Sequence, residues 1–409
     1  MPQIHPDHAE RVALLPSLKP AYSTSTPDQD GEDLLRQAGY IHVEGAPEPL
    51  PVKMPEFSVR ELRAAIPKHC FERSLSTSLY YLLKDLSICI ALLFVAVKFF
   101  SLQAANARKV FLLACGTHLT ALWILGHECG HNAFSDYKTL NEALGMLIHS
   151  ALLTPYHSWK ISHRHHHSNI GSMEHDEVFI PMTRSEYASW LEAVEENAED
   201  TPLYNLLRII AMLVIGWMPG YLVFNATGPA KYRTERRSHF DPWASLYNDR
   251  ERGLIMLSDA GVAVSLFVLG WLIKTYTFTT VGQLFLVPYM VVNAYMVIIT
   301  LLQHTDTFVP RFREASWTWL HGALCTVDRD FGGFLNRTLH HMPDTHVCHH
   351  IFASMPFYHA VEATQALRPL LGRYYLQDNT PVIQAFWRCY THCKYVEDDG
   401  SVVFCKKSL

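Results

Sequence analysis

The sequence predicts an all-α integral membrane protein in which four transmembrane helices form two hairpins and a helical cytosolic cap holds a two-metal site. Two observations lead to this prediction. Four apolar runs are long enough to cross a bilayer and occur as two pairs, each joined by a short loop. Three short histidine clusters lie just outside these runs, where imidazole side chains can bind metal ions on one side of the membrane.

The composition excludes other classes of protein. The chain has 409 residues and a net charge of −5, so it lacks the basic surplus of a nucleic-acid-binding protein. Nine cysteines, scattered from Cys70 to Cys405, indicate reduced thiols and not a disulfide framework. Residues 1–20 have no continuous apolar core, so we expect no cleaved signal peptide.

The chain divides into two regions of different composition. Residues 1–56 contain nine of the 22 prolines and many serines and acidic residues, so we expect a loose cytosolic arm. The membrane domain, residues 57–409, follows. Its first element is predicted by Ser58-Val59-Arg60-Glu61, a capping box that opens a short helix ending near Ile66.

The four spans are expected at residues 83–102, 110–126, 254–274 and 281–303. Short loops connect the first span to the second and the third to the fourth, so each pair forms a hairpin. The charged residues of the first run, Lys84, Asp85 and Lys98, lie near its ends, within reach of the membrane interface.

The apolar segment Leu206–Gly228 is predicted not to cross the membrane. The loop after it is basic, which places this loop in the cytosol, and the loop before it carries the second histidine cluster. A shared metal site requires both loops on one side, so the segment enters and leaves the same face. Trp217-Met218-Pro219-Gly220 supplies a break in its middle. Ala143–Leu153 is interpreted as interfacial too, and the cytosolic cap then comprises residues 127–253 and 304–409.

The histidine clusters are predicted to present metal ligands on helix faces. They are His127-Glu128-Cys129-Gly130-His131, His163-Arg164-His165-His166-His167 and His346-Val347-Cys348-His349-His350. Residues three or four apart share one face of a helix, which leaves out only His165. The eight remaining imidazoles are more than one ion can bind, so the clusters predict a pair of metal ions.

Spacing alone leaves the metal and the reaction open. His127-Glu128-x-x-His131 also matches the zinc metalloprotease signature, although a protease would leave the other two clusters without a role. A metal transporter would place its ligands inside the spans. An all-imidazole site for two ions suits iron among several metals, zinc and copper included. A di-iron oxygenase at the membrane surface agrees best with all three clusters.

The order of the clusters, together with three further motifs, resembles the membrane-bound Δ12 oleate desaturases of plants and fungi. The motifs are Ile66-Pro67-Lys68-His69-Cys70-Phe71, Tyr247-Asn248-Asp249-Arg250-Glu251-Arg252 and Thr326-Val327-Asp328-Arg329-Asp330. The likeness extends from about Phe57 to Val403. It implies a multi-pass enzyme of the endoplasmic reticulum membrane, with both termini in the cytosol, that inserts a cis double bond into a fatty acyl chain.

The resemblance also implies cofactors and partners. Two iron ions would use O2 and electrons from cytochrome b5 and its reductase, and the cytochrome would be a separate protein because the chain lacks a His-Pro-Gly-Gly haem motif. An oleoyl chain carried on a phospholipid or on CoA would enter an apolar tunnel from the bilayer. The implied metal ligands are His127, His131, His163, His166, His167, His304, His346, His349 and His350.

Three positions depart from the usual family pattern. Asn132 and Asp306 stand where the family commonly has histidine, and Cys348 stands where it has a small residue such as alanine. Relatives with the same scaffold include acetylenases, hydroxylases and conjugases, so a triple bond, a hydroxyl group or a conjugated diene on an oleoyl or linoleoyl chain is the second prediction.

The C-terminal Lys406-Lys407-Ser408-Leu409 resembles the dilysine retrieval signal of endoplasmic-reticulum membrane proteins.

Overall fold

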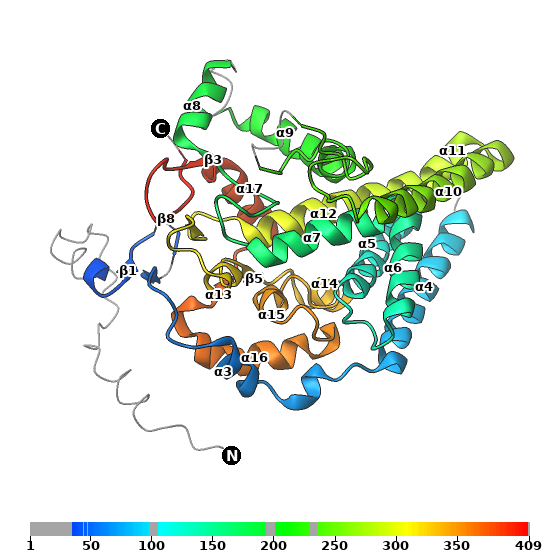
Figure 1. Ribbon diagram of the computed structural model, residues 1–409. Helices are drawn as coiled ribbons and strands as arrows, with labels where there is room; N and C mark the ends of the chain where they lie inside the picture. Colours follow the sequence, from blue (N-terminus) through cyan, green and yellow to red (C-terminus); the bar gives the residue numbers. More distant parts are fainter. Residues whose placement is uncertain are drawn as a thin grey trace.

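The computed structural model describes residues 35–43, 45–46, 48–98, 105–193, 201–229 and 235–407, and within them the chain is mostly helical (Figure 1). Most of the arm predicted for residues 1–56 lies outside the described residues. At its end, β1 (Tyr40–Ile41) pairs antiparallel with β2 (Leu50–Pro51). Leu50 is buried in an apolar cluster with Phe308 and Phe312, so this end of the arm packs against the membrane domain.

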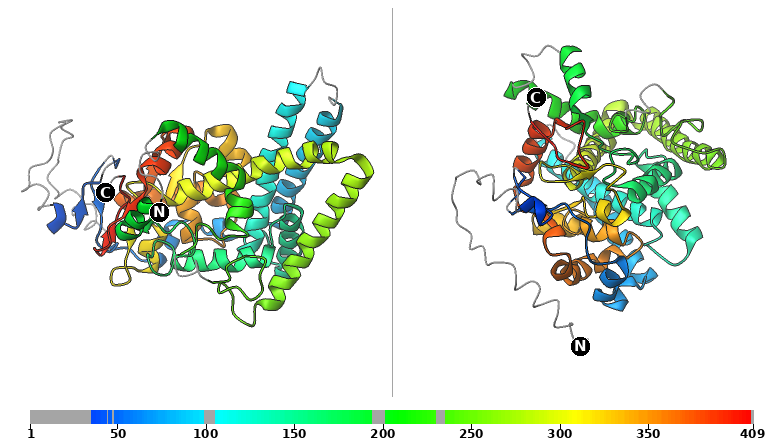
Figure 2. Two further views of the ribbon diagram at one scale, coloured as in Figure 1. Left: turned by 90° about the horizontal axis from the view of Figure 1, so that it is seen from above. Right: turned by 60° about the vertical axis from the view of Figure 1, so that its left-hand side comes forward.

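Two helical hairpins lie at one end of the molecule, opposite to β1 (Figure 2). The first consists of α4 (Leu75–Lys98) and α5 (Ala105–Gly130). The second consists of α10 (Arg252–Tyr276) and an arm that runs through α11 (Phe278–Val281), η5 (Gly282–Leu286) and α12 (Val287–His304). Helices α5 and α12 pack against each other, whereas α4 and α10 expose large apolar side chains such as Phe94 and Phe267. Such exposed apolar faces suit contact with lipid.

Helix α4 begins well before the span that its hydropathy predicted. It starts at Leu75, because the Ser74 hydroxyl accepts a hydrogen bond from the Thr77 amide at 3.3 Å and caps the helix. Its first turn contains Ser76, Thr77 and Ser78, so this end of the helix has no apolar run from which it could be recognised.

The segment formed by α9 (Pro202–Ile215) and η3 (Gly216–Tyr221) contains the predicted break. In the part of the chain that the structure describes, five helices are long and apolar enough to cross a membrane, and this segment is one of them. Its backbone leaves helical geometry at Met218, where φ is −120° and ψ is 117°. The amide of Met218 donates a hydrogen bond to Asn293 Oδ1 of α12 at 3.0 Å. The break therefore leaves this amide with a hydrogen-bond partner inside the protein.

The cap surrounds α7 (Tyr156–Asn169) and α15 (His346–Ile351), which carry the second and third histidine clusters. Helix α6 (Lys138–Ala151), which contains most of the predicted interfacial segment, has 14 residues and is too short to cross a bilayer. Helix α3 (Val59–Ala65) begins with the predicted capping box. The other helical segments are η1 (Lys68–Phe71), α8 (Arg184–Ala193), α13 (Trp319–Ala323), α14 (Gly333–Thr338), η6 (Phe357–His359), α16 (Ala360–Leu371), η7 (Gly372–Tyr374) and α17 (Val382–His392).

Short strands tie the C-terminal part of the cap to the segments next to the histidine clusters. Strand β3 (Met182–Thr183) lies parallel to β7 (Tyr395–Val396), and β4 (Arg311–Phe312) lies antiparallel to β8 (Val402–Val403). Strand β5 (Val327–Arg329) lies parallel to β6 (Leu376–Asp378). Because β4 follows α12 and β5 precedes α15, these pairings hold the chain in place near both helices.

Candidate metal centre and apolar cavity

Four helices bring the histidine clusters together. His127 lies in the last turn of α5, His131 directly follows this helix, and His304 is the last residue of α12. Helices α7 and α15 each present three histidines toward these two helix ends. As a result, all nine histidines that the resemblance implied as ligands lie in one cluster of neighbouring rings.

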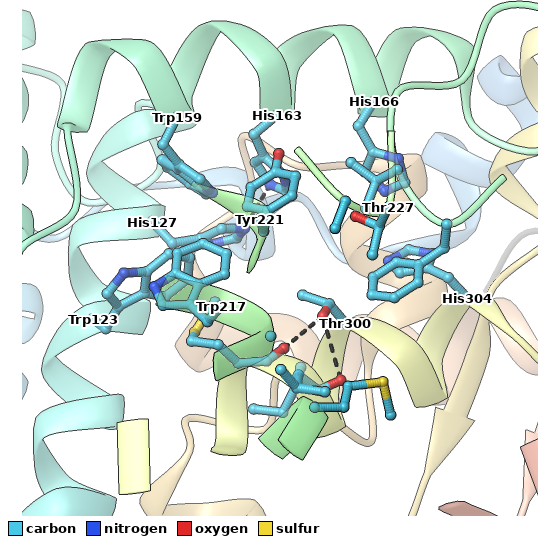
Figure 3. A pocket seen from close by; sticks show the side chains of 18 of the residues that line it. Trp123, His127, Trp159, His163, His166, Trp217, Tyr221, Thr227, Thr300 and His304 are labelled. Carbon is cyan, nitrogen blue, oxygen red and sulfur yellow. Dashed lines mark hydrogen bonds between the residues drawn. The ribbon is translucent and has the colours of Figure 1, made fainter. Parts of the chain in front are cut away.

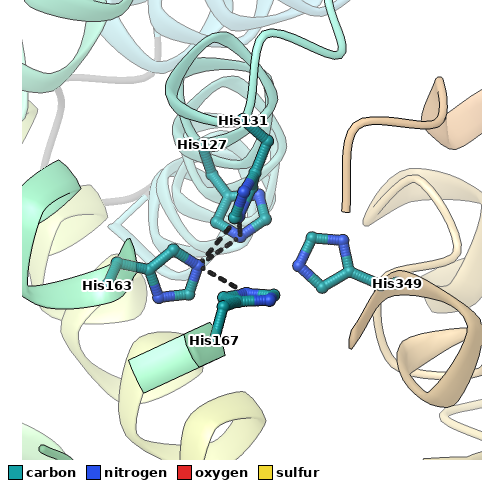
Figure 4. A group of neighbouring side chains, drawn as sticks. All are labelled: His127, His131, His163, His167 and His349. Carbon is teal, nitrogen blue, oxygen red and sulfur yellow. Dashed lines mark hydrogen bonds between the residues drawn. The ribbon is translucent and has the colours of Figure 1, made fainter. Parts of the chain in front are cut away.

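Five of these histidines form a first group, in which one ring nitrogen of each lies within 4.8 Å of all the others (Figure 4). They are His127, His131, His163, His167 and His349. The Nε2 atom of His163 lies 2.9 Å from that of His127, 3.0 Å from that of His131 and 3.1 Å from that of His167. The rings therefore converge on one point from α5, α7 and α15.

The other four histidines form a second group. The ring nitrogens of His166, His304 and His350 lie within 4.8 Å of one another. The Nε2 atom of His346 lies 3.1 Å from that of His304 and 3.1 Å from that of His350. The two groups adjoin, since the rings of His167 and His350 stack with centroids 4.1 Å apart.

The donor set fits a pair of metal ions. Two ring nitrogens that bind one ion at about 2.1 Å and at roughly a right angle are about 3 Å apart. Six pairs of Nε2 atoms, which involve seven of the nine histidines, have this spacing, between 2.9 and 3.2 Å. Nitrogens that converge in this way satisfy one another poorly as hydrogen-bond partners, whereas a shared ion uses all of them. An all-imidazole set suits iron among the transition metals.

For several of these rings, burial favours the neutral form, which is the form that binds a metal. Burial lowers the pKa of His163 and of His167 well below the ordinary value for histidine, and neighbouring histidine rings lower it further. The pKa values of His346 and His350 are lowered well below that value for the same reasons. At neutral pH the ring nitrogens are therefore free of the extra proton that would compete with a metal.

Asp176 and Arg311 orient the second group. Asp176 Oδ1 lies 2.8 Å from His166 Nδ1, and Arg311 donates to Asp176 Oδ2 at 2.9 Å and to the carbonyl oxygen of His304 at 3.0 Å. Burial would raise the pKa of Asp176, but His166 and Arg311 outweigh this effect and hold the pKa below its ordinary value. A carboxylate behind the ring fixes which nitrogen of His166 faces the centre. Sequence reasoning missed both residues, because no spacing signal connects them to the clusters.

Glu128 occupies the corresponding position behind His127. Its Oε1 atom lies 3.0 Å from His127 Nδ1, and the side chain is buried. In the metalloprotease reading, this glutamate would act as a base beside the metal and the other two clusters would have no role. The structure instead places Glu128 against Nδ1 of His127 and brings all three clusters to the same centre, which favours the hypothesis of a two-metal site.

Asn132 ends α5 and does not belong to either histidine group. Its φ is +55°, a left-handed conformation in which asparagine is one of the favoured residues. Its amide donates to the Cys129 carbonyl at 3.1 Å, and the next amide, of Ala133, donates to the Glu128 carbonyl at 2.9 Å. These two bonds form a Schellman motif, so the first departure from the family pattern serves to terminate the helix.

Asn132 lines a cavity beside His131, whereas the other two departures are held by contacts outside the two histidine groups. Asp306 is buried and paired with Arg329 and Arg388, in each case at 2.6 Å. Arg329 and Arg388 also contact Asp378, which makes a buried network of two acids and two bases next to the end of α12. Cys348 packs on the opposite side of α15, in an apolar cluster that includes Leu62.

The histidines that were not predicted as ligands lie elsewhere. His165 is half-exposed and is absent from both groups, as the helix spacing predicted. Of the two histidines just before the third cluster, His340 lies 3.0 Å from Asp85 of α4, and His341 lies 3.0 Å from Asp344. The grouping therefore separates nine histidines from their neighbours in the sequence.

An apolar cavity of about 400 Å³ opens onto the centre (Figure 3). Five histidines of the two groups form part of its lining. The rest is mainly apolar and includes Trp123, Trp159, Trp217, Met212 and Val297. This volume and lining are typical of a site for an apolar ligand.

A second, more polar cavity of about 800 Å³ reaches other histidines of the same centre. His131, His167 and His350 contribute to its lining, together with the basic residues Lys138, Lys160 and Arg164. The centre is therefore approached by two cavities of different chemistry, one apolar and one of mixed polarity that includes the ion pair of Lys160 and Glu142.

Comparisons with known proteins agree with this site. A family model described as fatty acid desaturase matches residues 106–381. The omega-6 fatty acid desaturase, endoplasmic reticulum isozyme 2, of Glycine max is 44% identical over 356 residues, which cover 86% of this chain and 91% of that protein. The oleoyl-12-hydroxylase of Ricinus communis is 43% identical over 85% of this chain and 89% of its own length. The bifunctional desaturase/conjugase of Vernicia fordii is 44% identical over 86% and 89%. The chain thus belongs to the fatty acid desaturase family of oxidoreductases.

Proposed function

We propose that this protein is a membrane-bound desaturase that inserts a cis double bond at the Δ12 position of an oleoyl chain. The observation that carries the proposal is the junction between an apolar cavity and a centre of nine histidines. An acyl methylene offers no polar group to bind, so its position must come from the shape of apolar walls. Relatives named Δ12 desaturases, such as that of Mortierella isabellina at 41% identity, support the position of attack.

The nine histidines would hold two iron ions. One ion would be bound by His127, His131, His163, His167 and His349, and the other by His166, His304, His346 and His350. When bound, the irons supply the activation of O2 that allows two hydrogens to be removed from an unactivated carbon chain, with two electrons from a separate donor. Asp176 and Glu128 would keep the rings of His166 and His127 in the binding orientation.

The cavity walls would hold the acyl chain and keep water out. Trp123 packs edge to face against Trp159 and Trp217, with ring centroids 5.0 and 5.5 Å apart. The hydroxyl of Tyr221 lies 3.3 Å from Ser162 Oγ, which ties η3 to α7, the helix of the second cluster. These contacts set the position of the cavity wall relative to the histidines, and a displacement of about 1 Å in such a site is sufficient to slow a reaction strongly.

We also propose that the two hairpins supply four membrane spans and that α9 and η3 lie at the interface. The break at Met218 and the basic residues Arg236, Arg250 and Arg252 that follow it support this topology. The cap and both termini would then face the cytosol. The name of the soybean relative supports the endoplasmic reticulum as the membrane.

Lys406 and Lys407 would form a retrieval signal for that membrane. Lys407 is exposed. The backbone of Lys406 pairs with Tyr395, and its Nζ lies 2.6 Å from Glu397, so reading of the signal would require this end of the chain to detach.

The electron donor would be a separate cytochrome b5, reduced by its reductase. The second cavity supports this route, because three histidines of the centre lie in its lining together with the basic residues Lys138, Lys160 and Arg164, of which Lys160 pairs with Glu142 and Arg164 with Glu251. Docking there would bring the haem edge of a carrier toward the first group of histidines without passing through the acyl cavity.

Expression in yeast supplied with oleate tests the proposal, with the His349→Ala variant as the inactive control. Conversion of oleate to linoleate by the wild type alone is the expected result, measured by gas chromatography of the fatty acids. A second candidate function is favoured by the hydroxylase and conjugase relatives, which are as similar as the desaturases. A hydroxyl, a triple bond or a conjugated diene as the main product, from oleate or from linoleate supplied separately, would establish it instead.

A further inference from the structure

A second cluster of metal-binding side chains lies outside the histidine centre. It combines His69 and Cys70 of η1 with His359, at the end of η6, and Glu362, in the first turn of α16. One nitrogen, sulfur or oxygen atom from each residue lies within 4.8 Å of the other three. The cluster joins residues that are far apart in the sequence, since 293 positions separate His69 from Glu362.

The distances within the cluster are close to those of a four-coordinate metal site. His69 Nε2 lies 2.9 Å from Glu362 Oε2 and 3.7 Å from Cys70 Sγ. With metal bonds of about 2.0–2.3 Å, the ligands of a tetrahedral ion are about 3.3–3.6 Å apart. The ring of His359 lies 5.4 Å from the ring of His69, measured between centroids, at an angle of 75°. Small side-chain rotations would therefore bring four donors to a common point.

The same geometry excludes a catalytic relay of cysteine, histidine and acid. In such a relay, the histidine uses one ring nitrogen for the nucleophile and the other for the acid. Here both the Cys70 sulfur and the Glu362 carboxylate approach the same atom, Nε2 of His69. Convergence of sulfur and oxygen on one nitrogen is the pattern of ligands around an ion.

We propose that His69, Cys70, His359 and Glu362 bind one zinc ion. A thiolate, two imidazoles and a carboxylate are the ligand types that Zn²⁺ takes in proteins, and four protein ligands make a closed, structural site. Cys70 is fully buried, whereas the side chains of His69 and Glu362 are 53% and 48% exposed. An ion can therefore enter from solvent past His69 and Glu362 and bind the buried sulfur of Cys70. The histidine centre differs in kind, because the described residues of its two groups offer only imidazole nitrogen.

The zinc site would stabilise the cap beside the third histidine cluster. Cys70 lies in the same buried apolar cluster as Val347 and Cys348, which belong to α15. The ion would link the segment that precedes the first hairpin to the helix that follows α15. A cross-link between such distant positions restricts the unfolded chain strongly, and the binding energy of a structural zinc ion adds to folding.

Metal analysis of the purified full-length protein tests this assignment. The wild type in detergent, expressed with added Zn²⁺, should contain about one zinc per chain, measured by mass spectrometry. His359→Ala and Glu362→Gln should lose the zinc and keep the wild-type iron content. Glu362→Gln is informative because glutamine retains a hydrogen bond to His69 but not the charge of a ligand. The matched control is His175→Ala, which removes a different exposed histidine from its contact with Glu314 at 3.9 Å.

Cobalt substitution supplies a readout that does not depend on activity. Protein stripped of metal and loaded with Co²⁺ should show a near-ultraviolet band from cobalt–thiolate bonding, and Cys70→Ser should lose this band. Thermal unfolding of each variant with and without Zn²⁺ would show whether it folds, and only the wild type and His175→Ala should gain stability from zinc. Equal zinc content in the wild type and in Glu362→Gln, or a cobalt spectrum of the folded wild type without the thiolate band, would overturn the proposal.

Discussion

Replacing Asp176 with asparagine should weaken the metal centre from behind His166. Asp176 Oδ1 faces His166 Nδ1 at 2.8 Å and also accepts the Glu177 amide at 2.8 Å, so this position must remain an oxygen. The asparagine nitrogen would then replace Oδ2, which accepts from the Gly171 amide at 3.1 Å and from Arg311 at 2.9 Å. The variant would therefore place a donor against two other donors inside the protein.

The magnitude of the effect follows from this burial. Arg311 is only 4% exposed, so it would lose its carboxylate partner in an environment that water does not reach. Breaking a buried ion pair by removing one partner costs about 3–5 kcal/mol of stability. Loss of a carboxylate that orients a metal-binding histidine lowers metal affinity or activity about 10–100-fold. We expect Asp176→Asn to show both effects.

Iron bound per chain at a series of free iron concentrations measures the affinity, and thermal unfolding measures the stability. Glu174→Gln is the matched control, because Glu174 lies nearby, is one-third exposed and contacts Arg313 at 3.5 Å, away from the centre. Wild-type iron affinity and activity in Asp176→Asn would show that the carboxylate does not orient His166, and the reasoning would fail.

Three further predictions concern the first cluster, the pH response and the topology. His131→Ala should abolish iron binding and activity, whereas Asn132→Ala should keep both and lose about 1 kcal/mol of stability. Asn132→Gly should restore this stability, because position 132 requires only a residue that adopts the left-handed backbone conformation. Equal iron loss in the two alanine variants would contradict the ligand assignment. In iron-free protein, the pKa values of His163 and His346 lie well below 6.5, so the unfolded chain binds more protons than the folded chain as the pH falls below about 6.5. The melting temperature of the iron-free protein should therefore fall as the pH is lowered below about 6.5, and it should be constant above this pH. A melting temperature independent of pH between 5 and 7.5 would refute the burial of neutral rings. A tag placed after Leu409 should be digested by protease added outside sealed microsomes, and protection of this tag would rule out the proposed orientation.

Spacing in the sequence was sufficient for features that depend on local geometry. The positions i, i+3 and i+4 determine a helix face, so the histidines of each cluster were found together and His165 was left out. The break near Met218 was likewise predicted from a Pro-Gly pair. The partners of these features come from other elements: Asp176 for His166, and Asn293 for the amide of Met218. Tertiary pairing of this kind leaves no periodic signal, so the sequence alone could not reveal it.

We expect the wall of the apolar cavity, and not the departures from the family pattern, to determine the product. Asn132 terminates α5, Asp306 lies between two arginines and Cys348 packs behind α15, and none of the three is among the described residues that line the apolar cavity. The choice between removing a second hydrogen and adding oxygen shifts tenfold for a barrier difference of about 1.4 kcal/mol. A small displacement of the acyl chain against the cavity wall can supply such a difference, so residues of the wall should control the outcome.

Thr300 tests this view, because it lines the cavity from α12 and its hydroxyl is occupied by a bond to the Met296 carbonyl at 2.5 Å. Thr300→Leu enlarges the side chain at the wall and leaves every histidine of the two groups in the sequence, and it should change the ratio of desaturated to hydroxylated or conjugated product in yeast supplied with oleate. Asn132→His and Cys348→Ala, which restore residues common in the family, should leave that ratio at its wild-type value. A ratio that responds to these two variants and not to Thr300→Leu would place control of the product beside the metal ligands and not in the cavity wall.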